Sequence, residues 1–143
     1  MKNILPIIGA IFSITLRAFS AAPAEEARFL GAVKSAFEKK DTKAFLGLYC
    51  WDGVTDFIKS VAEETTPETL AFKVGSITLV NAAPGTTIEF VREGVTYRNN
   101  LKVTKQIEVT YSRESKLKVT GKIIIPVGEK DGKLFITTAA PAK

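Results

Sequence analysis

The residues best suited to chemistry are the aromatic and acidic side chains around the chain's only Trp and only Cys. Residues 45–54 read FLGLYCWDGV and contain Tyr49, Trp51 and Asp52. An Asp in apolar surroundings can have a raised pKa and act as a base on a carbon acid. The sequence therefore allows an acid–base set of an aspartate with a tyrosine. Its candidates are Asp52, Asp56, Tyr49, Tyr97 and Tyr111.

The same residue types also have simpler structural roles. Asp52 can cap a helix, Asp56 can place a negative charge in a first helical turn, and Trp51 can be part of the core or of a pocket wall. Cys50 has no partner within the chain and is expected to be a small buried hydrophobe. We therefore assign no catalytic residue. The candidate ligand-binding residues are Tyr49, Trp51, Asp52, Lys105 and Tyr111.

The chain contains no histidine and one cysteine. Without histidine, neither Ser–His nor Cys–His nucleophile activation is available, and no histidine can ligate a metal. The sequence also has no Cys-x-x-Cys pair, no glycine-rich phosphate-binding loop and no nucleophile-elbow pattern. We expect neither a metal site nor a cofactor.

Lys105 breaks the alternation of the segment that contains it. Apolar residues alternate with polar ones from Leu101 to Tyr111, and Lys105 falls on the apolar side. If the register is unbroken, its ammonium lies on the concave side of the sheet, where an unpaired charge is costly. Asp52 or a small anionic ligand would then be its partner. A bulge or a strand start that turns Lys105 to solvent is the simpler account, and we favour it.

Four lysines are expected on the solvated face of the last long hairpin: Lys102, Lys116, Lys118 and Lys122. Such a basic patch is suited to an acidic polymer or an anionic envelope surface. Exposed lysines also keep strands from pairing with other chains, which explains the pattern equally well. Because no aromatic residues alternate with these lysines, we expect no specific nucleic-acid binding.

The first twenty residues have the pattern of an export signal. Lys2 is followed by an apolar run over residues 4–16 and by the small-x-small sequence Ala18-Phe19-Ser20. The run is too short to span a bilayer comfortably, so an uncleaved anchor is the less favoured alternative. We expect a signal peptide over residues 1–20 and a periplasmic or secreted chain over residues 21–143, without a transmembrane segment. Its net charge falls from +5 to +3 with the loss of Lys2 and Arg17.

The length of 143 residues, with 45% hydrophobic and 24% charged residues, fits one globular domain. Apolar periodicity predicts helices over residues 24–39, 41–49 and 54–64, and a further helical turn after Pro67. Strands are predicted over residues 70–80, 87–91, 101–111, 117–127 and 134–136. The phase of the first strand slips at Gly75-Ser76, which indicates a bulge. The expected fold is α+β, with two to three N-terminal helices packed in a strongly curved antiparallel sheet of four to five strands.

Two segments carry a resemblance to a known fold. They are DxxAFLxLYxxDGV over residues 41–54 and PVGEKDGKLFI over residues 126–136. With the order of elements, they make residues 21–143 resemble the nuclear transport factor 2-like superfamily. The resemblance implies a cone-shaped sheet with a pocket, but no single activity, because the superfamily contains isomerases, dehydratases, hydrolases and adaptors. A cystatin-like sheet on one helix is the nearest structural alternative.

From these observations we expect an exported module that binds a small ligand or a protein without catalysis. The ligand would be a small anion or an apolar molecule. One alternative is a pocket enzyme of isomerase or hydrolase type that uses an Asp and a Tyr. Another is a structural domain that forms a homodimer through its sheet. Whether the cone is open or filled with side chains decides between pocket and surface.

Overall fold

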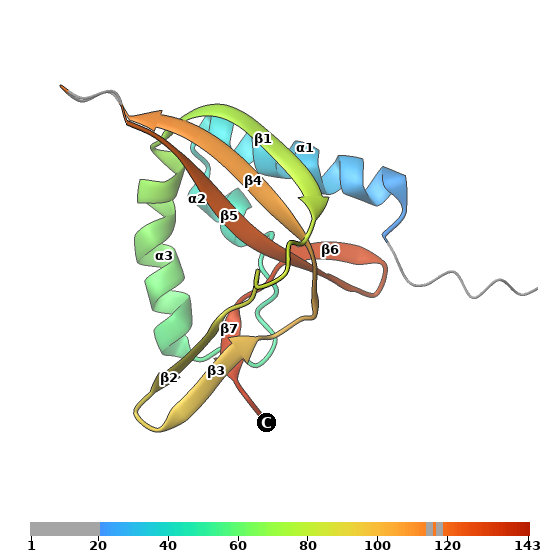
Figure 1. The fold of residues 1–143 in the computed structure, drawn as a ribbon, viewed down its shortest axis with the longest axis vertical. Coiled ribbons are helices and arrows are strands. Elements are labelled where there is room, and N and C mark those ends of the chain that lie inside the picture. The colour runs from blue at the N-terminus through green and yellow to red at the C-terminus, as the bar shows by residue number, and fades with distance from the viewer. Residues whose placement is uncertain (1–20, 114–115, 117–118) are drawn as a thin grey trace, which may run out of the picture.

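Three helices precede all the strands in the part of the chain that the structure describes, which is residues 21–113, 116 and 119–143 of a computed structural model (Figure 1). The helices are α1 (Pro23–Lys39), α2 (Thr42–Leu46) and α3 (Asp56–Leu70). The strands are β1 (Lys73–Asn81), β2 (Glu89–Arg92), β3 (Val95–Asn99), β4 (Val103–Arg113), β5 (Val119–Lys130), β6 (Lys133–Ile136) and β7 (Ala139–Pro141). The predicted α+β class is confirmed. The expected export signal over residues 1–20 lies outside the described residues.

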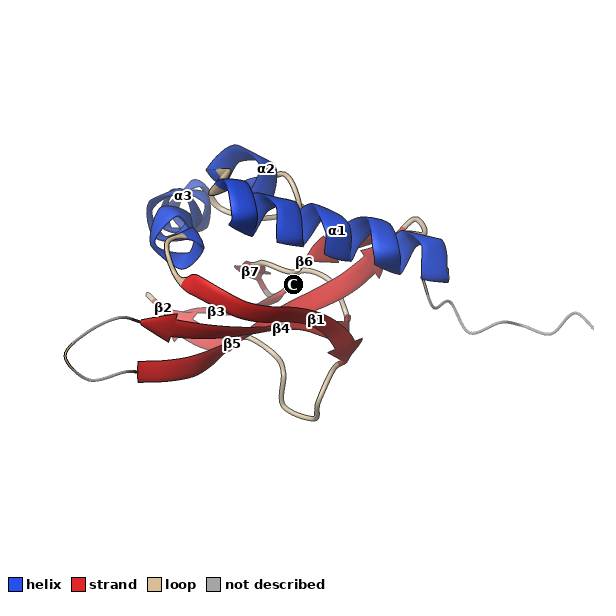
Figure 2. Ribbon diagram, turned by 90° about the horizontal axis from the view of Figure 1, so that it is seen from above, coloured by secondary structure: helices blue, strands red, loops and turns tan. Residues whose placement is uncertain are grey.

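The described strands form two antiparallel sheets. The larger has the order β1-β4-β5-β6, and the smaller has the order β2-β3-β7. The larger sheet is strongly curved, and α1 lies across its concave face in one layer with α2 and α3 (Figure 2). The curved sheet and the opening helices agree with the prediction. The smaller sheet was not predicted, because it forms only when the 89–99 hairpin pairs with the C-terminal residues 139–141.

Side chains fill the concave face of the large sheet beneath α1. The buried positions of α1 recur at helical spacing and are Phe29, Val33, Ala36 and Phe37. They join a core of strand residues that includes Ile107, Val109 and Val127, which have no exposed surface. This burial is the main stabilising contribution to the fold, since no disulfide is possible. The concave face beneath α1 is therefore core.

Local chemistry accounts for the ends of the helices. Pro23 occupies the first turn of α1, and the side chain of Asp41 caps α2 by accepting from the amide of Ala44 at 3.0 Å. Thr55 caps α3, so the prediction that Asp52 would cap this helix is wrong. α3 also continues through Pro67 instead of ending near residue 64.

Both irregularities of the large sheet occur in strands with a phase problem in the sequence. The register of β1 against β4 shifts between Val74 and Ser76, which confirms the predicted bulge. The register of β4 against β5 shifts between Val103 and Lys105. Beyond that shift the pairing is regular, so Lys105 lies on the same face as the buried Ile107.

Two glycines on opposite sides of the fold have contrasting surroundings. Gly121 of β5 pairs with Tyr111, and a Cβ at Gly121 would lie 2.5 Å from Cζ of that ring. Gly31 lies inside α1, and a Cβ there would meet nothing within 4 Å. A side chain at position 121 therefore has room only if the Tyr111 ring shifts, whereas a Cβ at position 31 points into open space.

We predict that Gly121→Ala lowers the free energy of unfolding by about 1–3 kcal/mol, because the Tyr111 ring must move. Gly31→Ala is the matched control and should raise the same free energy by about 0.5–1 kcal/mol, because alanine is the better helix former. Urea denaturation of both variants measures the difference. An unchanged stability of Gly121→Ala would contradict the packing of Tyr111 on this strand.

Candidate functional site

Tyr49 and Trp51, the two aromatic candidates of residues 45–54, lie between α2 and its neighbours. Tyr49 stacks on Trp51 with ring centroids 5.2 Å apart and meets Phe45 edge to face at 5.8 Å. The indole nitrogen of Trp51 donates to the carbonyl of Leu46 at 3.1 Å. Burial raises the pKa of Tyr49, and the nearby side chain of Thr66 in α3 partly offsets this rise. Tyr49 and Trp51 both connect α2 with its neighbours. Because its pKa is raised, Tyr49 is also a weaker proton donor than an ordinary tyrosine.

Asp52 does not have the electrostatics of a general base. Its carboxylate is exposed and forms an ion pair with Lys130 at the end of β5. The hydrogen bond from Lys130 and its positive charge lower the pKa of Asp52. Abstraction of a proton from carbon requires a shift in the opposite direction.

The remaining tyrosines are in other parts of the molecule. Tyr111 packs on Phe72 with centroids 4.4 Å apart, and Tyr97 stacks on Phe90 at 5.0 Å. Tyr111 is paired with Gly121, which is roughly 30 Å along β5 from Lys130, the partner of Asp52. The structure therefore does not gather the five candidate residues into one site.

Lys105 faces α1, so the favoured expectation that a bulge would turn it to solvent is wrong, and its charge is already neutralised. Its Nζ lies 2.8 Å from Oε1 of Glu26 and 3.1 Å from Oδ1 of Asn81, and the side chain is 16% exposed. The expectation of Asp52 as its partner is wrong, because the charge needed here comes from the first turns of α1. A small anionic ligand would have to displace Glu26 to reach this ammonium.

The predicted basic patch is dispersed over the sheet. Lys102 precedes β4 and Lys116 follows it, so the two lie roughly 35 Å apart along the strand. Lys122 forms an ion pair with Glu108 at 3.0 Å, which also lowers the pKa of Glu108. Lys118 lies outside the described residues. The described lysines do not form a compact cationic surface.

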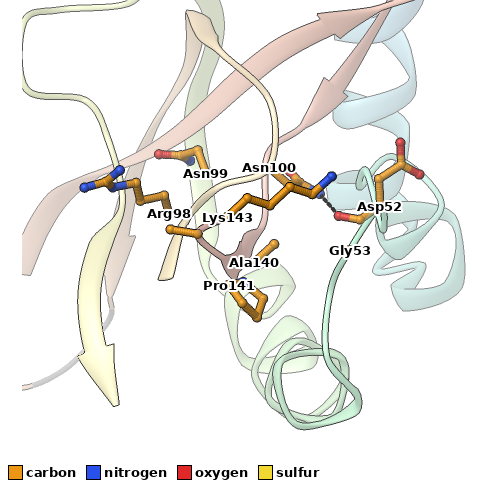
Figure 3. Close-up of a pocket in the computed structure, with 9 residues that line it drawn as sticks. Asp52, Gly53, Arg98, Asn99, Asn100, Ala140, Pro141 and Lys143 are labelled. Carbon is orange, nitrogen blue, oxygen red and sulfur yellow. Dashed lines mark hydrogen bonds between the residues drawn. The ribbon is translucent and has the colours of Figure 1, made fainter. Parts of the chain in front are cut away.

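An open cavity of about 390 Å³ lies between the small sheet and the turn that follows Trp51. Figure 3 shows side chains from β3, from β7 and from this turn around it. The lining residues are Asp52, Gly53, Arg98, Asn99, Asn100, Ala140, Pro141, Ala142 and Lys143. Sequence reasoning missed this cavity, because it is built from three segments that lie far apart in the chain.

The asparagine amides beside this cavity are used within the fold. Nδ2 of Asn100 donates to the carbonyls of Cys50 at 2.7 Å and Asp52 at 3.1 Å, and its Oδ1 accepts from the amide of Thr138 at 2.9 Å. Asn99 likewise donates to Thr137 and accepts from Ile88, both at 2.6 Å. These amides join the sheets to the turn, and few polar groups are left to hold a ligand.

A second candidate site is an exposed apolar surface between α3 and the β2–β3 hairpin. We call it the α3–hairpin surface; its members are Phe57, Val61, Phe90 and Val95, which are 45%, 39%, 37% and 40% exposed. The surface is continuous, because the guanidinium of Arg92 lies 3.4 Å from the Phe57 ring centre and Arg92 is paired with Val95. Sequence reasoning missed it, because Phe57 and Val61 are among the apolar positions that predicted the helix over residues 54–64, and such positions are normally covered.

Acidic residues surround the helical half of the α3–hairpin surface. Helical spacing places Phe57, Val61, Glu64 and Glu68 in one row, opposite the buried Thr66 and Leu70. The exposed acids of α3 have no ion-pair partner within the described residues; they are Asp56, Glu63, Glu64 and Glu68. The solvent face of α3 therefore combines large apolar side chains with uncompensated negative charge.

The Lys105–Glu26 pair can be tested by a double-mutant cycle. Glu26→Gln should lower the free energy of unfolding by about 1–3 kcal/mol, because it leaves a mostly buried ammonium without a counter-charge. Lys105→Met should cost less than about 1.5 kcal/mol, because a flexible apolar chain fills the same space. Urea denaturation of the single and double variants gives the coupling. The control pair Arg98–Glu89, with both side chains 60% exposed, should couple by less than about 1 kcal/mol. Equal coupling in the two pairs would contradict this assignment.

Among the described residues, no three His, Cys, Asp or Glu side chains gather as a metal site would require. No described helix has the length and apolar character needed to cross a membrane. Comparison with protein-family models, curated proteins and solved structures gives no match for this chain. The resemblance to the nuclear transport factor 2-like superfamily thus stays a prediction from the sequence.

Proposed function

We propose that this chain is an exported, non-catalytic module that binds a protein segment through the α3–hairpin surface. The observation that carries the proposal is the combination of exposed Phe57 and Val61 with four acids on one helix that have no ion-pair partner among the described residues. Grouped apolar side chains with a polar rim are typical of interaction sites. The partner would present apolar side chains together with lysine or arginine.

The distribution of charge supports a basic partner. The whole chain has a net charge of +5, yet α3 carries four acids and one lysine. Several acids elsewhere form ion pairs, as in Lys105–Glu26 and Lys130–Asp52. Unmatched acids beside an apolar row favour a complementary positive segment and disfavour an acidic one.

The pocket alternatives have less support. An anion site at Lys105 competes with Glu26, and an acid–base site at Asp52 has the pKa shifted in the wrong direction. The concave face beneath α1 is occupied by core side chains. A surface for a protein partner remains the function that fits the described residues best.

We predict that the protein binds a labelled helical peptide that carries apolar residues three or four positions apart along one face, with lysines beside them. Phe57→Ser combined with Val61→Ser should weaken binding at least about tenfold, because it removes the apolar row. Glu64→Lys with Glu68→Lys should weaken it comparably, and added salt should reduce the wild-type affinity. Fluorescence anisotropy measures each dissociation constant.

The matched control for this titration is Ile124→Ser on β5, because Ile124 is 41% exposed but lies outside the α3–hairpin surface. Its affinity for the peptide should equal that of the wild type. A second control replaces the lysines of the peptide with glutamates and should abolish binding. Equal binding of both peptides, or equal weakening by Ile124→Ser, would contradict the proposed surface.

Export is tested at the N-terminus of the protein from its producing cell. Ala21 is 6% exposed and packs in the core, and the carbonyl of Ala22 accepts from the amides of Glu25 and Glu26 in the first turn of α1. Cleavage after Ser20 retains both residues, whereas cleavage after Ala22 would remove both. N-terminal sequencing should therefore begin at Ala21. Soluble protein that begins at Met1 would contradict export.

A further inference from the structure

The edges of the two sheets differ in how their free backbone groups are used. The edge of β6 is covered, because Ile136 donates to Leu48 and accepts from Cys50, and Glu25 accepts from the amide of Leu134 at 3.0 Å. The Arg28 side chain holds that carboxylate in place and lowers the pKa of Glu25 to about 2. The edge of β7 carries Pro141, which has no amide hydrogen to donate.

The other two edges belong to β1 and β2. β1 is bulged between Val74 and Ser76, and bulges disfavour pairing with another chain. β2 has no proline and no bulge, and all four of its residues are exposed. Val91 is 68% exposed, the highest value among the large hydrophobic residues that the structure describes. Figure 1 shows the β2–β3 hairpin extending away from the large sheet.

The turn of this hairpin determines which backbone groups point outward. Glu93 and Gly94 both have positive φ, 50° and 76°, as in a two-residue type I′ turn. In such a turn the flanking pair, here Arg92 and Val95, is hydrogen-bonded. The N–H and C=O groups of Phe90 and Arg92 therefore point to β3. Those of Glu89 and Val91 point outward, where no described strand pairs with them.

We propose that a second copy of this chain pairs its β2 with this edge, antiparallel and about a two-fold axis. The pairing joins the two small sheets into one of six strands, in the order β7-β3-β2 and then β2-β3-β7 of the second copy. A two-fold interface uses the same patch on both copies, so β2 has to be complementary to itself. Strand addition at an open edge supplies the backbone hydrogen bonds.

Charge selects the register of this pairing. A two-fold axis perpendicular to the sheet keeps each face continuous, so only residues of equal parity can lie opposite one another. The two-fold axis can therefore pass through residue 89, 90, 91 or 92 of β2, which gives four registers. Three of them place like charges opposite one another: the axis at 89 pairs Glu89 with Glu89, the axis at 92 pairs Arg92 with Arg92, and the axis at 91 pairs Glu89 with Glu93 of the second copy. The fourth places Phe90 opposite Phe90 and Glu89 opposite Val91, which avoids every such pair.

In this register Phe90 lies at the axis. Its position there is a non-hydrogen-bonded pair, where opposite side chains come closest. Phe90 already stacks on Tyr97 with the rings 6° from parallel, so the dimer has an aromatic row of Tyr97 and Phe90 from both copies. The two α3–hairpin surfaces then meet across the axis. The dimer does not depend on the proposed peptide binding, which Phe57→Ser tests separately.

Sedimentation velocity from about 1 µM to about 500 µM should show a concentration-dependent dimer, because four-residue strands form a small interface. Phe90→Lys and Phe90→Glu should each be monomeric over the same range, because like charges meet at the axis. Mixing the two variants should restore a dimer, because opposite charges then face each other. Far-ultraviolet circular dichroism checks that each variant is folded.

Two further variants keep the test specific. Ile124→Lys, an equal charge change on an exposed residue of β5, should leave the dimer intact. Val91→Pro removes an outward amide hydrogen and should weaken the dimer at least about tenfold. The proposal is overturned by a wild type that stays monomeric at the highest concentration. It is equally overturned by dissociation of Ile124→Lys, or by no dimer in the mixture of folded Phe90 variants.

Discussion

The side-chain amide of Asn100 is the interaction on which the arrangement of the two sheets depends. It donates to the carbonyls of Cys50 and Asp52 and accepts from the amide of Thr138, so one residue ties together β3, β7 and the turn between α2 and α3. Thr138 adds a hydrogen bond from its hydroxyl to the same Cys50 carbonyl at 2.9 Å. The Cys50 and Thr138 residues in this network are buried, and leaving one of their polar groups without a partner would cost about 1–3 kcal/mol. The small sheet is thus attached to the main body by polar contacts, whereas α1 is attached by an apolar core.

That attachment leaves the β2–β3 hairpin with few contacts of its own. The contact of Arg92 with Phe57 connects it to α3, and residues 139–141 pair with β3 on the other side. The face of the hairpin that carries Phe90 and Val95 and the edge of β2 consequently remain exposed. An exposed apolar edge is usually avoided in monomeric proteins, so its presence favours a role in association.

The ion pairs separate the structural charges from those available to a partner. Glu26 neutralises Lys105 inside the fold, and Glu108 and Asp52 are matched by Lys122 and Lys130 on the sheet. Each pairing removes a residue that could otherwise be assigned to a pocket. The acids of α3 have no such neighbour among the described residues, and they lie beside the largest exposed apolar side chains of the helix layer. Electrostatic complementarity of this kind acts mainly on partner choice and association rate.

Local patterns in the sequence determined the first helix, the start of the second helix near residue 42 and the bulge before Ser76. Each of these follows from periodicity or turn chemistry within a few residues. Only the tertiary structure decided that Glu26 is the partner of Lys105 and that Asp52 has a lowered pKa. It also decided that the cavity side chains of Asn99 and Asn100 hold the sheets together and that Phe57 faces solvent. The physical reason is that hydrogen bonds and ion pairs join residues far apart in the chain, and amphipathic spacing states that a helix has an apolar face but not what covers it.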